Sequence, residues 1–229
     1  MTIPAEKTNE IITRLSQLRR DPRNADEFTV ALIKQEIERL KNVNISRSYM
    51  LQGMLETVLF NQEKTISHFE KALLLSDRDK TVLWNYASSL LSFGIFDDSE
   101  KLFLELANSL QRNDEIAKEL FRMGKYQLAK QFSTTNNENL NISEAAEHFN
   151  LDDADISKAI QIAGSYLVNN GFLISGARIL FLGDRIVHYI LTAADPESLA
   201  DLEYKMVEEL FDNEVDIEHL VISYMGLGL

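Results

Sequence analysis

A set of large and small side chains recurs along the chain with a spacing of 34 residues. The two copies of this set are Tyr49, Gly53, Phe69, Ala72 and Leu75, and then Leu83, Ala87, Phe103, Leu106 and Ser109. A repeat of this length can hold two helices and a turn, and each unit buries its apolar face only against its neighbours. The period therefore predicts antiparallel helix pairs that stack on one another.

The spacing resembles that of the tetratricopeptide repeat family. In this family a large residue, a small residue four positions later, and a large and a small residue on the second helix lock two helices together. Gly53 takes the small position on the first helix of the first copy. The chain departs from the family at Thr65 and Ser99, where the usual residue is Ala, and at Asp77, where it is Pro. The resemblance covers about residues 46–134 and implies a helical array with a concave surface.

A shorter third unit and an N-terminal cap extend this array. The third unit follows the second copy and has Gly124 in its turn. Before the first copy, two amphipathic stripes are separated by Asp21-Pro22, which predicts a helical hairpin without the repeat's signature. A terminal hairpin of this kind is typical of a capping unit. We therefore expect a first domain over residues 1–135.

The resemblance also indicates which side chains line the concave surface. Carried over position by position, these are Arg47, Met50, Met54, Thr57, Val58, Trp84, Ser88, Leu91 and Ser92. A partner helix or extended peptide would suit Trp84 beside Met50 and Met54, because a rigid aromatic ring and flexible thioethers bury area adaptably. The alternative is that Trp84 packs within the protein itself.

The last third of the chain follows a different pattern. Residues 133–141 are polar and predict a linker, and Ser143 is expected to start a short helix. A longer helix is expected over about 152–169, followed by a short strand at 172–174 and a β-hairpin around Gly183-Asp184.

A further helix is expected from Pro196, and the segment DIEHLVISYM is expected to be a strand. These elements predict an acidic α+β domain over residues 142–229, with an all-helical domain as the alternative. The fold class is therefore mainly α, with tetratricopeptide-like helix pairs followed by a small α+β domain.

The net charge of −13 is confined to one part of the chain. Residues 136–229 hold 4 basic and 17 acidic side chains, whereas residues 1–135 hold 19 of each. Such a surface favours a basic or neutral protein partner and repels nucleic acid, although acidic surfaces also serve solubility. The segment 142–160 resembles a helix-turn-helix in length, but its second helix would open with three aspartates, so we expect no nucleic-acid partner.

Signatures of catalysis are lacking in the sequence. The chain has no cysteine and none of the nucleotide, nucleophile-elbow or zinc-protease motifs. Of the four histidines, only His188 and His219 are expected to be able to meet, across paired strands. We therefore predict no enzyme activity, no cofactor and no metal. No apolar run is long enough to span a bilayer and the first residues do not form a signal peptide, so we predict a cytoplasmic protein without a membrane partner.

These observations favour an adaptor or chaperone-like protein that binds a peptide or helix of another protein in the concave surface. Two alternatives stay open. One is an immunity or inhibitor protein whose acidic C-terminal domain covers a basic partner, and the other is an enzyme or small-ligand protein with a site in that domain. The oligomeric state does not follow from the sequence.

Overall fold

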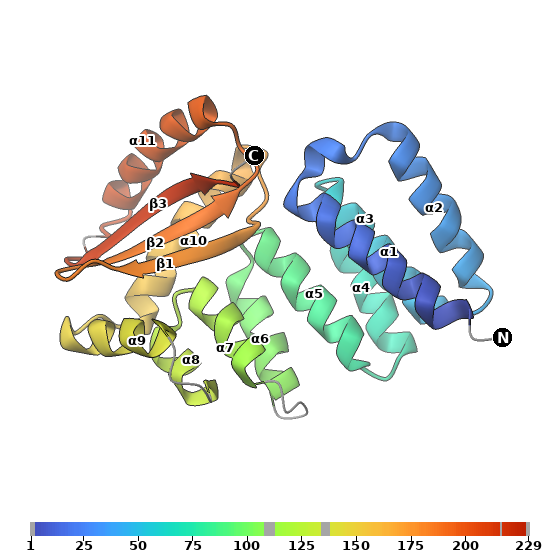
Figure 1. The fold of residues 1–229 in the computed structure, drawn as a ribbon, viewed down its shortest axis with the longest axis horizontal. Coiled ribbons are helices and arrows are strands. Elements are labelled where there is room, and N and C mark those ends of the chain that lie inside the picture. The colour runs from blue at the N-terminus through green and yellow to red at the C-terminus, as the bar shows by residue number, and fades with distance from the viewer. Residues whose placement is uncertain (1–2, 108–112, 134–137, 216, 228–229) are drawn as a thin grey trace. The chain divides into compact units, whose positions relative to one another are not determined.

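The computed structural model describes residues 3–107, 113–133, 138–215 and 217–227 (Figure 1). The chain divides into two compact units, residues 1–92 and 93–229. This division differs from the predicted domain boundary at residues 135–142. The boundary falls inside the second predicted repeat copy, between its two helices. The second of these helices packs onto the third predicted unit, whose helices pack in turn onto the helix and strand that follow them, so all of them belong to the C-terminal unit.

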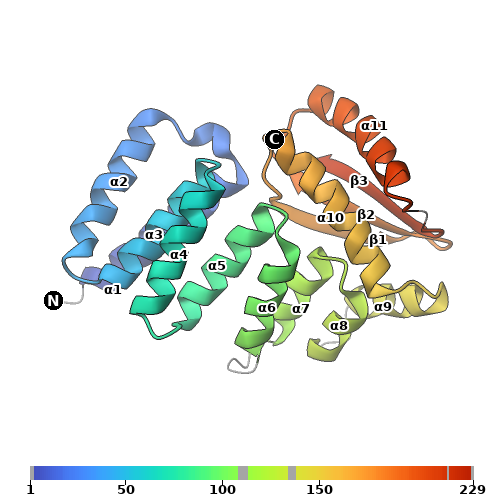
Figure 2. The same ribbon diagram turned by 180° about the vertical axis from the view of Figure 1, so that it is seen from behind.

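Unit 1 is a helical array. Its described elements are α1 (Ile3–Arg20), a short 3₁₀ turn (Pro22–Asn24), α2 (Glu27–Lys41), α3 (Ile45–Val58), α4 (Gln62–Leu75) and α5 (Lys80–Ser92). The helices α3 and α4 form the first predicted pair and lie side by side in Figures 1 and 2. Asn44 and Asn61 cap them, since each side chain accepts a hydrogen bond from a backbone N–H in the first turn.

Unit 2 starts with helices and ends with a small sheet. Its described elements are α6 (Phe96–Ala107), α7 (Asn113–Arg122), α8 (Tyr126–Phe132), α9 (Glu138–His148), α10 (Asp153–Asn169), β1 (Gly176–Phe181), β2 (Ile186–Thr192), α11 (Pro196–Asp212) and β3 (Leu220–Gly226). Mainly helical structure with a small α+β part is thus confirmed.

The predicted turns between helices are present, and each contains a residue in the left-handed conformation. Gly94 and Gly124 have φ values of 71° and 76°, a region that glycine enters without the steric cost of a Cβ. Phe60, which lies 34 residues before Gly94, has φ 59° and takes the same role in the first pair. The period of 34 therefore extends to the backbone conformation of the turn.

The sheet has the order β1-β2-β3. The predicted hairpin around Gly183-Asp184 is present, with β1 and β2 antiparallel, whereas β2 and β3 are parallel and connected through α11. Register places His188 opposite Ile222 and Ile190 opposite Tyr224, so these side chains share one face. The helix α10 lies behind this sheet in Figure 1 and in front of it in Figure 2, and the Tyr224 hydroxyl donates to a carbonyl of α10 at 2.6 Å.

Three predicted details differ from the structure or fall outside it. Residues 172–174 are not a strand and lead into β1 as an irregular segment. The helix α9 begins at Glu138, inside the predicted linker, and Ser143 lies buried in its middle, where its hydroxyl donates to the Tyr126 carbonyl. Ser109, the last member of the second repeat copy, lies outside the described residues.

Candidate functional site

The predicted concave-surface residues are mostly inaccessible. Seven of them are buried: Met50, Met54, Thr57, Val58, Ser88, Leu91 and Ser92. Arg47 and Trp84 are half-buried. The Arg47 guanidinium forms an ion pair with Asp79 at 3.1 Å, so it is tied to the start of α5. The prediction that Met50 and Met54 form an open binding surface is therefore not supported by their burial.

Four neighbouring helices explain the burial in α3. This helix contacts α1, α2, α4 and α5, and it carries buried residues around most of its circumference; the more accessible stripe is formed by Ile45, Tyr49, Gln52 and Glu56. Ile11 and Leu15 of α1 are themselves 0% and 1% exposed. A helix surrounded in this way is a core helix rather than the wall of a groove.

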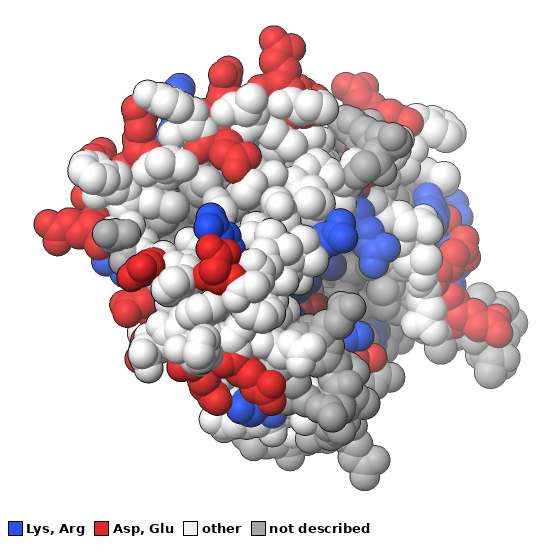
Figure 3. Space-filling view, turned by 60° about the vertical axis from the view of Figure 1, so that its left-hand side comes forward, with Lys and Arg blue, Asp and Glu red and all other residues white. Residues whose placement is uncertain are grey.

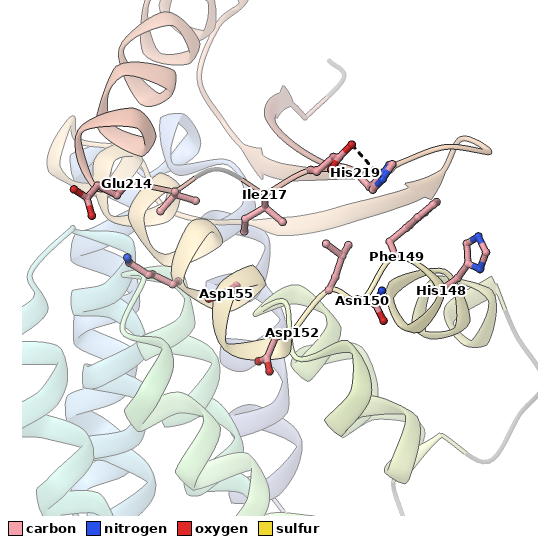
Figure 4. Close-up of a pocket in the computed structure, with 12 residues that line it drawn as sticks. His148, Phe149, Asn150, Asp152, Asp155, Glu214, Ile217 and His219 are labelled. Carbon is pink, nitrogen blue, oxygen red and sulfur yellow. Dashed lines mark ion pairs between the residues drawn. The ribbon is translucent and has the colours of Figure 1, made fainter.

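Unit 2 contains a pocket of about 890 Å³ where α9 meets the start of α10 and the loop before β3 (Figure 4). Its lining residues are His148, Phe149, Asn150, Leu151, Asp152, Asp155, Lys158, Glu214, Val215, Ile217, Glu218 and His219. They come from two segments about sixty residues apart in sequence, which the parallel β2-α11-β3 connection brings to the same end of the sheet.

One wall of the pocket is aromatic. The Phe149 ring stacks on the imidazole of His219, with centroids 4.3 Å apart and an interplanar angle of 15°. Phe149 also contacts His148 edge-on, with centroids 5.2 Å apart. The His219 ring is oriented by the Asp184 carbonyl, which accepts from Nδ1 at 2.7 Å. This bond leaves Nε2 on the side of Glu218, whose carboxylate lies 3.7 Å away.

Carboxylates outnumber amines around this wall. Asp155, Glu214 and Glu218 are exposed at the pocket, while Lys158, the one lysine among its described lining residues, donates to the Asn213 carbonyl at 3.3 Å. Asp152 accepts from the backbone N–H of Ala154 at 2.6 Å and thereby caps α10. In the space-filling view of Figure 3, acidic side chains occupy more of the visible surface than basic ones do. The pocket therefore suits a positively charged group.

Backbone conformation is unusual at three residues that line the pocket. Asn150, Glu214 and His219 have φ values of 54°, 55° and 67°. The first two follow α9 and α11 and close these helices with left-handed caps, an ordinary arrangement. His219 ends no helix, and its carbonyl accepts from the Ile186 N–H at 2.7 Å at the start of the β2-β3 pairing. The sheet therefore holds this side chain at the pocket.

His188 does not meet His219. It lies on the covered face of β2, fully buried, and its Nδ1 is 2.8 Å from the Tyr126 hydroxyl of α8. Burial, with a smaller contribution from the nearby Arg122 charge, lowers the pKa of His188 to about 3. The prediction that the two histidines could share a site is therefore wrong, because β3 begins only after His219.

Of the residues that line the pocket, His219 is named as a candidate from the sequence, but paired with His188 and not with Phe149 or His148. Two features of the sequence could have indicated the pocket: the aromatic and polar residues of the turn after α9, and the acidic segment before β3. Comparison of the chain with family models, with curated proteins and with solved structures finds no match. Among the described residues, no helix is both long and apolar enough to cross a bilayer, and no three His, Asp or Glu side chains are grouped so as to hold a metal ion.

Proposed function

We propose that the protein is a non-enzymatic adaptor that binds a basic segment of a partner protein, and that the pocket of unit 2 receives one of its Lys or Arg side chains. The observation that carries this proposal is the pairing of the Phe149–His219 stack with Asp155, Glu214 and Glu218 around one cavity. The tetratricopeptide resemblance of the helical repeats supports an adaptor role in general, because such repeats serve protein recognition.

A cation over an aromatic face gains about 0.5–2 kcal/mol, depending on how much water it loses. Carboxylates at the rim add attraction that depends on salt, and the excess of acidic residues after position 136 steers a basic partner toward unit 2. In unit 1, taken by itself, Trp84 is half-buried, whereas Met50 and Met54 contribute to the core.

The test uses a short unstructured peptide that contains Arg and Lys, and a matched peptide with Gln in their places. We expect NMR shifts of Phe149 and His219 with the basic peptide alone, and loss of binding at about 0.5 M salt, where the screening length is only several Å. The double variant Asp155→Asn/Glu218→Gln should weaken binding, whereas Glu63→Gln/Glu70→Gln, which removes the same charge from exposed positions on α4, should not. Equal binding of both peptides would contradict the proposal.

A small-ligand protein is the second candidate, because His148 and His219 line one cavity with several carboxylates. A panel of small metabolites, assayed by the rise in melting temperature, separates the two. A metabolite that stabilises the protein and is not displaced by the basic peptide would favour this second function.

A further inference from the structure

The helix α11 is apolar on two opposite faces. Leu202 and Met206 on the inner face are 6% and 0% exposed, and this face packs against α10 and β3. The outer face carries Tyr204, Val207 and Phe211, which are 69%, 57% and 83% exposed. An ordinary surface helix has one apolar stripe, whereas the second stripe of α11 is left exposed by the part of the chain that the structure describes.

The outer stripe has the spacing of a coiled-coil seam. Together with the exposed Ala200, the stripe consists of Ala200, Tyr204, Val207 and Phe211, which are four, three and four residues apart. This spacing is that of d, a, d and a positions in a heptad repeat. In this register Asp201 and Glu208 occupy e positions, and Glu203 occupies a g position. Side chains at e and g form the interhelical ion pairs that select a partner.

The charges beside the seam indicate which kind of partner can bind there. Within α11, six carboxylates stand against one lysine, Lys205. A second copy of this chain would bring acidic e and g positions against acidic ones, which is repulsive. Helices that lie on membranes carry Lys and Arg beside their apolar face, so anionic lipid is also disfavoured. A helix with Lys or Arg at its e and g positions complements all three acidic positions.

The geometry points to the outer face of α11, formed by Ala200, Tyr204, Val207 and Phe211, as a docking surface for an amphipathic helix of a partner protein whose apolar stripe is flanked by basic side chains. The inference rests on the proposed function in taking the partner to be basic. The surface itself is separate from the pocket, because none of its four residues lines it. Two heptads make a short seam that binds weakly by itself. The outer face of α11 and the pocket would therefore bind the same partner at two places.

The experiment measures binding of synthetic helical peptides to the full chain by fluorescence anisotropy. One 17-residue peptide, equal in length to α11, carries Leu at a and d and Lys at e and g; a second carries Glu in place of Lys; a third has the Lys peptide's composition without the stripe. We expect the Lys peptide to bind at least about tenfold more tightly than the other two, since the seam needs both the stripe and the charge.

Substitutions locate the binding to this face. Tyr204→Ser/Phe211→Ser should weaken the Lys peptide by about tenfold or more, as expected for exposed aromatic anchors. Phe28→Ser/Leu74→Ser is the matched control, because these side chains are 79% and 85% exposed on α2 and α4 of unit 1. The charge reversal Asp201→Lys/Glu208→Lys should exchange the preference, so that the Glu peptide binds more tightly than the Lys peptide.

Several results would overturn the inference. These are equal binding of the Lys and scrambled peptides, unchanged binding by Tyr204→Ser/Phe211→Ser, self-association of the chain that this variant abolishes, or binding to phospholipid vesicles that it abolishes. The pocket variant Asp155→Asn/Glu218→Gln separates the two proposals. If it loses the short basic peptide but keeps the helical Lys peptide, both hold; if the wild-type chain binds only the helical peptide, the pocket proposal fails alone.

Discussion

Gly53 of α3 lies directly against the ring of Phe69 of α4. A Cβ placed on Gly53 would be 2.6 Å from Phe69 Cδ2 and 2.7 Å from Cε2. Phe69 is fully buried and stacks on Tyr86 of α5, with ring centroids 5.0 Å apart. The aromatic ring is thus held on both sides, and only a glycine lets the two helices approach this closely.

Gly53→Ala is therefore expected to destabilise unit 1. The methyl group must displace a packed ring, which costs about 1–3 kcal/mol, and this exceeds the gain of roughly 1 kcal/mol that alanine brings to a helix interior. Urea unfolding of Gly53→Ala, Phe69→Leu and the double variant checks the prediction. The double variant should lose less stability than the sum of the two single changes, and a more stable Gly53→Ala would contradict the close contact.

Met50→Ala tests whether α3 belongs to the core. Met50 is 0% exposed, so its truncation should lower the free energy of unfolding by about 2–5 kcal/mol. Leu74→Ala is the control, since Leu74 is 85% exposed and its truncation should change stability by less than about 0.5 kcal/mol. If both variants lost a similarly small free energy of unfolding, Met50 would belong to an open surface and not to the core.

These contacts mark what sequence patterns can predict here. The Gly53–Phe69 approach is local to one helix pair, and its size pattern repeats 34 residues later, so the sequence predicts the hairpin and its turn. Met50 lies on a helix that α1, α2, α4 and α5 contact, and its sulfur is 3.8 Å from the Asn85 amide of α5; no local pattern encodes this set of neighbours. A repeat resemblance assigns positions to faces, but it does not tell which face a neighbouring helix covers.

The C-terminal unit illustrates the same limit. The hairpin at Gly183-Asp184 follows from turn chemistry and flanking apolar runs. The pocket does not, because Phe149 and His219 meet only when β3 adds to β2 in a parallel register across α11. Parallel pairing is not visible in either strand's own sequence. The sequence of α11 contains two apolar stripes, and the inner one, which consists of Leu199, Leu202, Met206 and Leu210, is the one that predicts a buried face.

Acid should weaken the fold through His188. The neutral imidazole is favoured in the folded chain, where its pKa is about 3, and the unfolded chain binds a proton below about 6.5, the ordinary value. Stability contributed by this group is thus complete above pH 6.5 and falls toward pH 3, by at most about 1.4 kcal/mol per pH unit. Unfolding measured between pH 7.5 and 4.5 should show this slope.

His188→Gln isolates the effect. Glutamine does not titrate and its amide can still meet the Tyr126 hydroxyl, so the variant should be less stable at pH 7.5 but lose stability more slowly on acidification. The pKa of His68 is also lowered by burial, with the same sign, and its contribution cancels between the wild type and the variant. Parallel pH profiles for the two proteins would exclude His188 as the cause.

Asp153 of α10 caps a second helix of unit 2, α8, which is not adjacent to it in the sequence. Its carboxylate accepts from the backbone N–H of Gln127 at 2.9 Å and from that of Leu128 at 3.0 Å, and so caps α8 from the first turn of α10. Asp153→Ala leaves these two N–H groups without their acceptor and removes a negative charge from a helix N-terminus, which should cost about 1–2 kcal/mol. Asp155→Ala, at an exposed position two residues later, is the control for charge and for helix propensity. Hydrogen exchange should locate the loss to α8, whose amides become less protected in Asp153→Ala alone; protection lost equally in both variants would mean that net charge, rather than the cap, holds α8 in place.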